Sequence, residues 1–264
     1  MNSSGFLSPV EQKEFLVQLF HDQGLSLSSE QASRFILFYE RLVEKNKVMN
    51  LTAITEFQEV CIKHFLDSVM LLKTLPELLQ SEGEEREALR LIDVGTGAGF
   101  PGLPLKIMLP DTEILLLDAL QKRIDFLKET AEACGLSKIG FLHERAEDGA
   151  QTPKERPKFP EESSLRESFD LAVSRAVAYL PVLLEYCLPY VRTGGLFVSY
   201  KSGKISDELE QASNALEVLG GVTEKIDEFT LPDGSGRSLI LFRKVRETPD
   251  QYPRRAKKIE KSPL

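Results

Sequence analysis

The stretch that decides the fold is LIDVGTGAGFPGLPLKIMLP, which runs from Leu91 to Pro110. Its first residues are apolar, glycines follow at once, and the remainder has the apolar spacing of a helix. Glycine lets the backbone bend sharply and lie close to a ligand, because it carries no Cβ. A strand that ends in glycines and turns into a helix is therefore typical of a site that binds a nucleotide or nucleoside.

The sequence after this stretch keeps alternating between strands and helices. Strands are expected at 89–94, 113–118, 138–143, 169–174 and 195–201, and helices at 101–109, 121–134, 178–190 and 205–219. Such alternation indicates a mostly parallel sheet covered by helices on both faces. Two further strands, VTEKIDEFTL and RSLILFRKV, surround the turn PDGSG, so we expect an antiparallel hairpin at the end of the sheet.

The first part of the chain reads as helices instead. Ser8, Pro9 and Glu11 come close to a capping box, in which side chains cap free backbone N–H groups at a helix start. A second helix is expected over residues 28–50, and a third over residues 56–75, which ends before a proline.

These patterns divide the chain into regions. Residues 1–80 form an N-terminal helical region, and the charged stretch 81–88 is expected to be a linker. Residues 89–245 form the α/β domain, in which the proline-rich stretch 151–168 reads as an exposed insertion. Residues 246–264 form a basic C-terminal tail.

The composition is that of an ordinary soluble globular protein, with 42% hydrophobic and 28% charged residues. The amino terminus lacks the pattern of a signal peptide, and no apolar run is long enough to cross a membrane, so we expect a cytoplasmic protein. The cysteines and histidines are few and far apart, which argues against a disulfide framework and against a metal site.

Charge is distributed unevenly along the chain. The net charge is −8, but the last segment, QYPRRAKKIEKSPL, has a local balance of +4 and leaves −12 for the rest. Basic tails on acidic proteins often contact phosphate backbones. A tail that only keeps the chain soluble would have the same composition.

The spacing of the glycines distinguishes between cofactors. A dinucleotide fingerprint requires Gly-x-Gly-x-x-Gly, but the third position here is Phe100. The order Asp93-x-Gly95-x-Gly97-x-Gly99 is instead the spacing of S-adenosylmethionine-dependent methyltransferases. The methionine end of that cofactor carries an ammonium and a sulfonium, so a carboxylate at Asp93 suits its positive charge.

The ends of later strands supply further candidate contacts. Asp118 lies 23 residues after Gly95, where a carboxylate can accept hydrogen bonds from ribose hydroxyls. Ala146 and Glu147 follow the third strand, where adenine is usually held. The alternative is a glycine turn that only packs, with Asp118 as a helix cap. The residues expected to contact the cofactor are Asp93, Gly95, Gly97, Gly99, Phe100, Asp118, Ala119, Leu120, Ala146, Glu147 and Arg175.

From about residue 30 to its end, the chain resembles the glucose-inhibited division protein B family. The resemblance is carried by NLTAI with HFLDSVMLL, DVGTGAGFPGLPLKI, LLDALQKRIDFL, AVSRAVAYLPVLLEYCLP and YPRRAKKIEKSPL. It implies a class I, Rossmann-like methyltransferase fold with S-adenosylmethionine as cofactor. It also implies methylation of N7 of one guanosine in the 530 loop of 16S ribosomal RNA, with that RNA or the small ribosomal subunit as partner. We expect a monomer.

Two features depart from the pattern of that family. Residues 151–168 look longer than usual, and the tail lacks the customary glycine after RRA. Neither feature touches the glycine loop, so only the expected RNA contacts are affected.

The chemistry implied by this resemblance needs few catalytic groups. Guanine N7 has an exposed lone pair and no proton, so methyl transfer to it requires no general base and depends on positioning. The sequence AVSRAVAYL stands where enzymes that methylate an exocyclic amine carry Asp/Asn-Pro-Pro-Tyr. Arg175 and Arg123 are the candidate catalytic residues, and Arg175 could hold a phosphate or the O6/N7 edge of guanine. A salt bridge from Arg175 to Asp93 or Asp170 is the alternative.

RNA is expected to bind at one rim of the site and at the tail. The candidate residues are Arg123, Arg175, Lys201, Arg254 and Arg255. His64 and Asp67 match a motif of the resembled family, although they could also form a packing contact between helix and sheet.

Two other classes of protein remain open from the sequence. A nucleotide-dependent oxidoreductase would share the glycine loop, but its third glycine would lie one position later. A non-catalytic RNA-binding protein would keep the fold with a vestigial pocket, and the intact loop and Asp118 argue against it.

Overall fold

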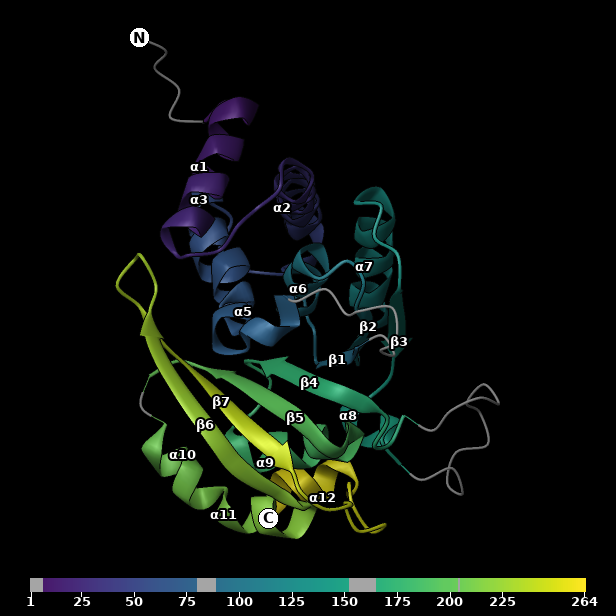
Figure 1. The fold of residues 1–264 in the computed structure, drawn as a ribbon. Coiled ribbons are helices and arrows are strands. Elements are labelled where there is room, and N and C mark those ends of the chain that lie inside the picture. Colours follow the sequence, from purple (N-terminus) through teal and green to yellow (C-terminus); the bar gives the residue numbers. More distant parts are fainter. Residues whose placement is uncertain (1–6, 80–88, 152–164, 204) are drawn as a thin grey trace.

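The computed structural model describes residues 7–79, 89–151, 165–203 and 205–264 (Figure 1). The expected linker 81–88 and most of the expected insertion 151–168 therefore lie outside the described residues.

A seven-stranded sheet forms the centre of the described part, with the strand order β3-β2-β1-β4-β5-β7-β6 (Figure 1). The strands are β1 (Arg90–Val94), β2 (Glu113–Asp118), β3 (Ile139–His143), β4 (Phe169–Arg175), β5 (Val191–Lys201), β6 (Gly221–Thr230) and β7 (Gly236–Lys244). The first five are parallel, whereas β7 runs antiparallel to both β5 and β6. This arrangement confirms the expected fold class, including the antiparallel terminal hairpin.

The strand order reverses at the centre of the sheet. β1 pairs with β2 on one side and with β4 on the other, and its residues Leu91–Val94 are buried. The connections that leave two such strands diverge, which opens a crevice at the carboxyl ends of the strands. The glycine loop follows β1 and therefore lies at this crevice.

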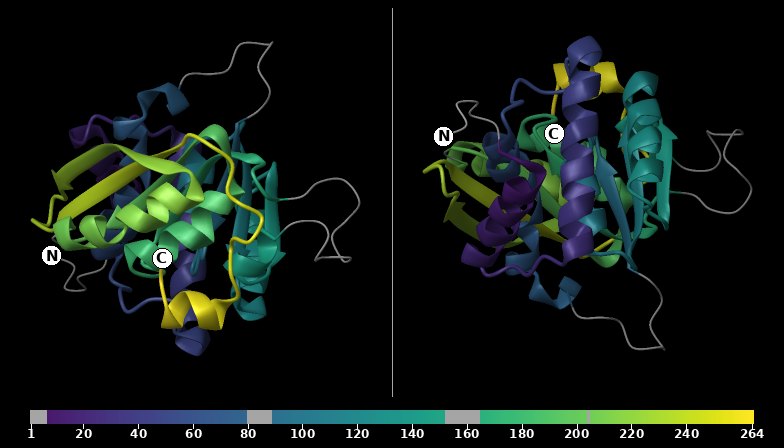
Figure 2. Two further views of the ribbon diagram at one scale, coloured as in Figure 1. Left: turned by 90° about the horizontal axis from the view of Figure 1, so that it is seen from below. Right: turned by 90° about the horizontal axis from the view of Figure 1, so that it is seen from above.

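Helices cover both faces of the sheet (Figures 1 and 2). One face carries the N-terminal helices together with α6 (Gly102–Met108) and α7 (Gln121–Ala133). The other face carries α8 (Ala146–Gly149), α9 (Leu180–Cys187), α10 (Ser206–Gln211), α11 (Ser213–Leu219) and α12 (Ala256–Lys261). Each layer packs its own hydrophobic cluster against the sheet, as expected for a sheet buried on both sides.

The N-terminal helices α1 (Pro9–Asp22) and α2 (Ser29–Met49) begin at capping boxes. The hydroxyls of Ser8 and Ser28 each accept a hydrogen bond from the backbone N–H three residues later. The side chains of Glu11 and Gln31, at those later positions, accept hydrogen bonds from the backbone N–H groups of Ser8 and Ser28. The buried faces of both helices share one cluster with α6, α7 and the sheet, which includes Phe20, Phe35, Phe38, Leu116 and Leu127.

The third expected helix, over residues 56–75, is present as one helical segment that ends before Pro76, but it is not α-helical throughout. The segment consists of α3 (Phe57–Val60), the π-helix η1 (Cys61–Leu66), α4 (Asp67–Val69) and α5 (Leu71–Thr74), and then the 3₁₀ turn η2 (Pro76–Leu79). A π-helix has a wider turn than an α-helix and is often found at functional sites. Apolar spacing does not reveal it, because one wide turn leaves the buried face nearly continuous.

The C-terminal residues fold back on the protein instead of forming a free tail. Nη2 of Arg254 lies 2.6 Å from Oε2 of Glu185, a fully buried residue of α9. Ile259 of α12 is also fully buried and belongs to the cluster around α9. The described residues contain no helix that is long and apolar enough to cross a membrane.

The last residues of the expected insertion, 165–168, belong to the packed structure rather than to an exposed loop. Glu167 accepts a hydrogen bond from Nζ of the fully buried Lys244, at 2.8 Å. The guanidinium of Arg166 donates to the carbonyl oxygens of Ala150, Thr248, Pro249 and Tyr252. These contacts bind the C-terminal segment to the sheet.

We predict that Ile259→Ala lowers the free energy of unfolding by about 2–4 kcal/mol, because it leaves a cavity between α12 and α9. Chemical denaturation measures this loss. The control Lys257→Ala removes an exposed side chain of the same helix and should change stability by less than about 0.5 kcal/mol. Equal stability of both variants would mean that α12 is not docked in solution.

Candidate functional site

A cavity of about 510 Å³ opens at the carboxyl ends of the central strands. This volume is in the range of small-molecule sites. The residues that line it include Leu51, Thr52, His64, Gly95, Thr96, Gly97, Phe100, Asp118, Ala119, Leu120, Arg123, Arg145, Ala146, Glu147, Arg175, Val177 and Tyr186. Most of the residues expected to contact the cofactor are thus brought together around one cavity.

The glycine loop presents bare backbone to the cavity at Gly97. Its φ is +61°, and a Cβ built there would meet only the Gly95 carbonyl, at 4.0 Å. A larger side chain would therefore point into the cavity itself. Gly95, with a φ of +75°, is needed for a different reason, because its Cβ would lie 2.5 Å from Cγ2 of Val177. This space above Gly97 fits a ligand that lies against the backbone.

Gly99 and Asp93, two of the expected cofactor contacts, are not among the residues that line the cavity. A Cβ at Gly99 would collide with Leu103 and Leu127, so this glycine allows α6 and α7 to pack closely. Asp93 is fully buried, and its Oδ2 accepts a hydrogen bond from the backbone N–H of Gly102, at 2.8 Å. Burial raises the pKa of Asp93 to about 7. Its carboxyl group holds the loop from beneath.

Asp118 organises the loop and also faces the cavity. Its Oδ2 accepts the backbone N–H of Gly97 and its Oδ1 accepts that of Leu120, both at 2.9 Å. Arg123 approaches the same Oδ2 at 3.3 Å. The alternative of a helix cap is wrong, because the N-cap of α7 is Leu120 and no side chain caps it; Asp118 instead closes the turn that precedes the helix. Oδ2 thus has two donors, but Oδ1 has only one and keeps a second lone pair, so Asp118 can still accept a hydroxyl from a ligand.

The wall after β3 is formed by Ala146 and Glu147. The Tyr190 hydroxyl donates to the Ala146 carbonyl at 2.6 Å and fixes this turn. Burial raises the pKa of Glu147. Leu120 is exposed at the mouth of the cavity, and an exposed apolar side chain there can cover one face of a ligand ring.

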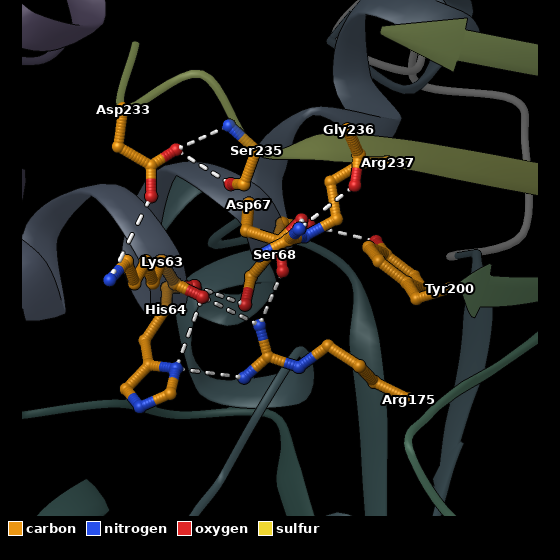
Figure 3. Close-up of polar contacts among 10 residues, drawn as sticks. All are labelled: Lys63, His64, Asp67, Ser68, Arg175, Tyr200, Asp233, Ser235, Gly236 and Arg237. Carbon is orange, nitrogen blue, oxygen red and sulfur yellow. Dashed lines mark hydrogen bonds and ion pairs between the residues drawn. The ribbon is translucent and has the colours of Figure 1, made fainter. Parts of the chain in front are cut away.

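Arg175, at the end of β4, is held firmly in the cavity wall (Figure 3). Its Nη1 donates to Oδ2 of Asp67 at 2.9 Å and to the Lys63 carbonyl at 3.3 Å. Its guanidinium also lies over the ring of Phe100, 5.0 Å from the centroid. Arg175 thus forms the salt bridge that was considered as an alternative, but its partner is Asp67 and not Asp93 or Asp170, because η1 brings Asp67 to this place.

His64 joins Thr52 to the same wall. Its Nε2 lies 2.8 Å from Oγ1 of Thr52, and its ring stacks on Phe100 with centroids 4.6 Å apart. Burial, together with the charge of Arg175, lowers the pKa of His64 to about 4. The imidazole is therefore neutral at physiological pH. Sequence reasoning singled out His64 only through a family motif and missed Thr52.

Two of the expected RNA contacts are engaged within the protein. Nζ of Lys201 lies 2.6 Å from Oε2 of Glu208 in α10 and also donates to the Ala178 carbonyl. Arg254 is paired with Glu185, as described above. Arg123 is more accessible, with 38% of its side chain exposed. Arg145, which sequence reasoning missed, lines the cavity with 63% of its side chain exposed. Arg255 is exposed at the start of α12.

The described residues contain no cluster of three or more His, Cys, Asp or Glu that could hold a metal ion. The chemistry of the cavity is that of a backbone cradle, one carboxylate that accepts hydrogen bonds, and one fixed guanidinium.

A sequence model of the family described as rRNA small subunit methyltransferase G matches residues 31–238. The chain belongs to this family. Two proteins named ribosomal RNA small subunit methyltransferase G are close in sequence. That of Lachnoclostridium phytofermentans is 46% identical over 94% of this chain and 96% of its own. That of Lactobacillus johnsonii is 44% identical over 91% of this chain and 95% of its own.

The crystal structure of the [4+2]-cyclase SpnF shares the fold alone, with a TM-score of 0.51 and 14% identity over 82% of this chain and 96% of that one.

Membership of this family decides the class of reaction. The protein is an S-adenosylmethionine-dependent methyltransferase that acts on small-subunit ribosomal RNA, which confirms the resemblance and the cofactor predicted from the sequence. The oxidoreductase alternative is excluded.

We predict that the ring of His64 titrates near pH 4 instead of near its usual 6.5. The folded protein then resists protonation that the unfolded chain accepts. Stability is complete above about pH 6.5 and is lost as the pH falls towards 4, by about 3 kcal/mol. NMR titration of the ring and denaturation at several pH values measure both effects.

The control for this titration is His64→Gln, which should lack that part of the pH dependence. A midpoint above pH 6, or an unchanged pH dependence in the variant, would contradict the prediction.

Proposed function

We propose that the protein methylates N7 of one guanosine in the 530 loop of 16S ribosomal RNA. The observation that carries this proposal is the fixed guanidinium of Arg175 beside the glycine cradle at Gly97, in the same cavity. The family and its substrate RNA support it, as does the resemblance in the sequence motifs. Methylation of an exocyclic amine would need a polar motif after β4 that AVSRAVAYL does not supply.

The residues of the cavity fit S-adenosylmethionine. Its methionine part would lie along Gly95 and Gly97, where a Cβ at Gly97 would intrude. Asp118 would accept the ribose hydroxyls, and Ala146 and Glu147 would border the adenine. When bound, the cofactor supplies an electrophilic methyl group on a sulfonium.

The protein's own residues then bind and orient the base. N7 already carries the lone pair that attacks the methyl carbon, so no proton has to leave before transfer. His64 has a low pKa and is a weak proton acceptor, and Asp93 is buried beneath the loop. Arg175 faces the cavity and would donate to the O6/N7 edge of the guanine or to a neighbouring phosphate. Arg123 would contact RNA at the mouth.

We predict that the enzyme forms 7-methylguanosine and that no group acting as a base in the transfer makes its single-turnover rate pH-dependent between about pH 6.5 and 8.5. Tritiated-methyl transfer to 16S ribosomal RNA lacking the modification, followed by nucleoside analysis, measures both. Asp93 has a pKa of about 7 and supports the glycine loop, so its protonation can lower the rate at the acidic end of this range. Such a fall in rate should disappear in Asp93→Asn, whose amide oxygen can still accept the Gly102 N–H.

Two outcomes would contradict this proposal. One is a methylated nucleoside other than 7-methylguanosine. The other is an acidic limb that persists in Asp93→Asn and vanishes when Glu147 is changed to Gln, which would reveal a general base at the wall after β3.

We further propose that α12 provides the main electrostatic contact with RNA. Glu260 of this helix lies near enough to act on the pKa values of Glu147 and Tyr186, which both line the cavity. The exposed cations of the C-terminal segment therefore flank the site on that side, and they are Arg255, Lys257, Lys258 and Lys261. Arg254 is excluded from this set by its pairing with Glu185.

Replacing these four cations with alanine should flatten the salt dependence of RNA binding by about 3 units on a log–log plot, at about 0.7–0.9 per phosphate contact. Cofactor affinity and stability should stay unchanged, because Arg254 and Ile259 are kept. Fluorescence anisotropy at several salt concentrations and calorimetry with S-adenosylmethionine measure these quantities. An unchanged slope would mean that RNA docks elsewhere.

A further inference from the structure

The turn between β6 and β7 lies against the N-terminal segment that borders the cavity (Figure 3). Nζ of Lys63 lies 3.8 Å from Oδ2 of Asp233, whose other oxygen accepts the backbone N–H and the hydroxyl of Ser235. Farther along β6, the Thr74 hydroxyl donates to Oδ2 of Asp227, at 2.6 Å. The hairpin is thus attached to this segment at several separate points.

Asp67 is the point where this attachment meets the site. Its side chain is only 5% exposed and contacts two arginines from two different strands. Oδ2 accepts Arg175 of β4 at 2.9 Å, and Oδ1 lies 3.3 Å from Nε of Arg237 of β7. Figure 3 shows Asp67 between the two guanidinium groups. Oδ2 is held by a hydrogen bond, whereas Oδ1 has only the ion pair with Arg237, and the two contacts together favour one orientation of the carboxylate.

The two arginines differ in their relation to the cavity. Arg175 lines it, whereas Arg237 does not and has 19% of its side chain exposed on the hairpin side. Arg237 also donates to its neighbouring carbonyl at Gly236, at 2.9 Å. The contact that links Arg237 to the cavity wall therefore runs through Asp67, while its charge also acts through space on His64.

The backbone of η1 adds a second constraint on the same group. Within this wide turn the carbonyl of Lys63 accepts from Arg175, and the carbonyl of His64 accepts from the hydroxyl of Ser68 at 2.6 Å. The Tyr200 hydroxyl of β5 donates to the Ser68 carbonyl at 2.7 Å. The backbone around Asp67 is thus fixed by the sheet, and its carboxylate remains to be oriented by its two partners.

We propose that Arg237 is a positioning residue for Arg175, and that it acts by holding Oδ1 of Asp67. The proposal rests on the proposed role of Arg175 at the reacting base. Arg237 keeps Oδ2 aligned with Arg175 and also shares the negative charge of the carboxylate. The hairpin at the end of the sheet thereby helps to build the binding wall for RNA.

The charges explain why this sharing matters. Arg175 and Arg237 carry two positive charges against one negative charge on Asp67. Lys63, on the outer side of this group, is paired with Glu59 at 2.6 Å and lies 3.8 Å from Asp233. A neutral His64 adds nothing. Without Arg237, the pair of Arg175 and Asp67 would be neutral, and a neutral pair attracts an electron-rich guanine edge or a phosphate far less than a pair with one excess positive charge.

Arg237→Gln tests the proposal, since it removes the charge but keeps a polar side chain of similar length. We expect single-turnover methyl transfer to fall about 10- to 100-fold, with affinity for S-adenosylmethionine changed by less than about 3-fold. Arg237→Lys, which restores the charge, should recover most of the rate. Thr74→Val is the matched control, because it breaks another contact of the hairpin without touching Asp67, and it should leave the rate as in the wild type.

The double variant Arg175→Lys with Arg237→Gln separates positioning from general loosening. If Arg237 acts through Arg175, the double variant is no slower than Arg175→Lys alone. The proposal would be overturned if the rate losses of the two single variants multiplied in the double variant. It would also be overturned if Arg237→Gln kept the wild-type rate, or if Thr74→Val lost as much rate as Arg237→Gln.

A spectroscopic measurement distinguishes failure of this proposal from failure of the proposed function. The ¹⁵N–¹H signal of Arg175 Nε, assigned with Arg175→Lys, should shift or broaden in Arg237→Gln and stay in place in Thr74→Val. An unmoved signal overturns the positioning role. A shifted signal together with full activity of Arg175→Lys would mean instead that Arg175 is not at the reacting base, so the proposed function of Arg175 fails while its coupling to Arg237 stands.

Discussion

The hydrogen bonds that Asp118 accepts from two backbone N–H groups are the interaction on which the rest of the site depends. They join the loop after β1, at Gly97, to the turn after the neighbouring strand β2, at Leu120, beside the point where the strand order reverses. Without them, two neighbouring loops would end with unpaired N–H groups at the crevice, which is costly where water is excluded. With them, the backbone at Gly97 is kept flat enough to receive a ligand, and Asp93 supports the loop from the buried side.

The N-terminal helices complete this site because a parallel sheet supplies only one rim. Arg175 ends β4 and would carry an isolated charge if α1 to α5 were absent, since its partners Asp67 and the Lys63 carbonyl lie in or next to η1. Removing a charged side chain from water is unfavourable unless its charge is compensated. The guanidinium of Arg175 can therefore take its place in the wall only when the N-terminal segment is packed against the sheet. The same hydrophobic cluster that runs from Phe20 to Leu127 stabilises both.

Local features of this fold could be predicted from the sequence, and features that depend on distant contacts could not. The capping box at Ser8 and the terminal hairpin each depend on residues that are close together in the sequence, so both could be predicted and both are confirmed. The wide turn η1 leaves no local signal, and it decides that Arg175 pairs with Asp67 rather than with Asp93. For the same reason, Gly99 was expected to contact the cofactor, because spacing alone cannot tell a glycine that faces a ligand from one that faces a helix.

The number of cations available to bind phosphate differs most between what the sequence suggests and what the structure shows. Counting makes every cation near the site available to phosphate, but Lys201 and Arg254 are engaged by Glu208 and Glu185, with only 12% of either side chain exposed. These pairs fix α10 and the C-terminal segment against the rest of the protein, so their charges serve the fold. Arg255, Lys257, Lys258 and Lys261, in contrast, are exposed in the C-terminal segment. An acidic protein can in this way bind RNA through a few positions, while its overall charge opposes binding at other places.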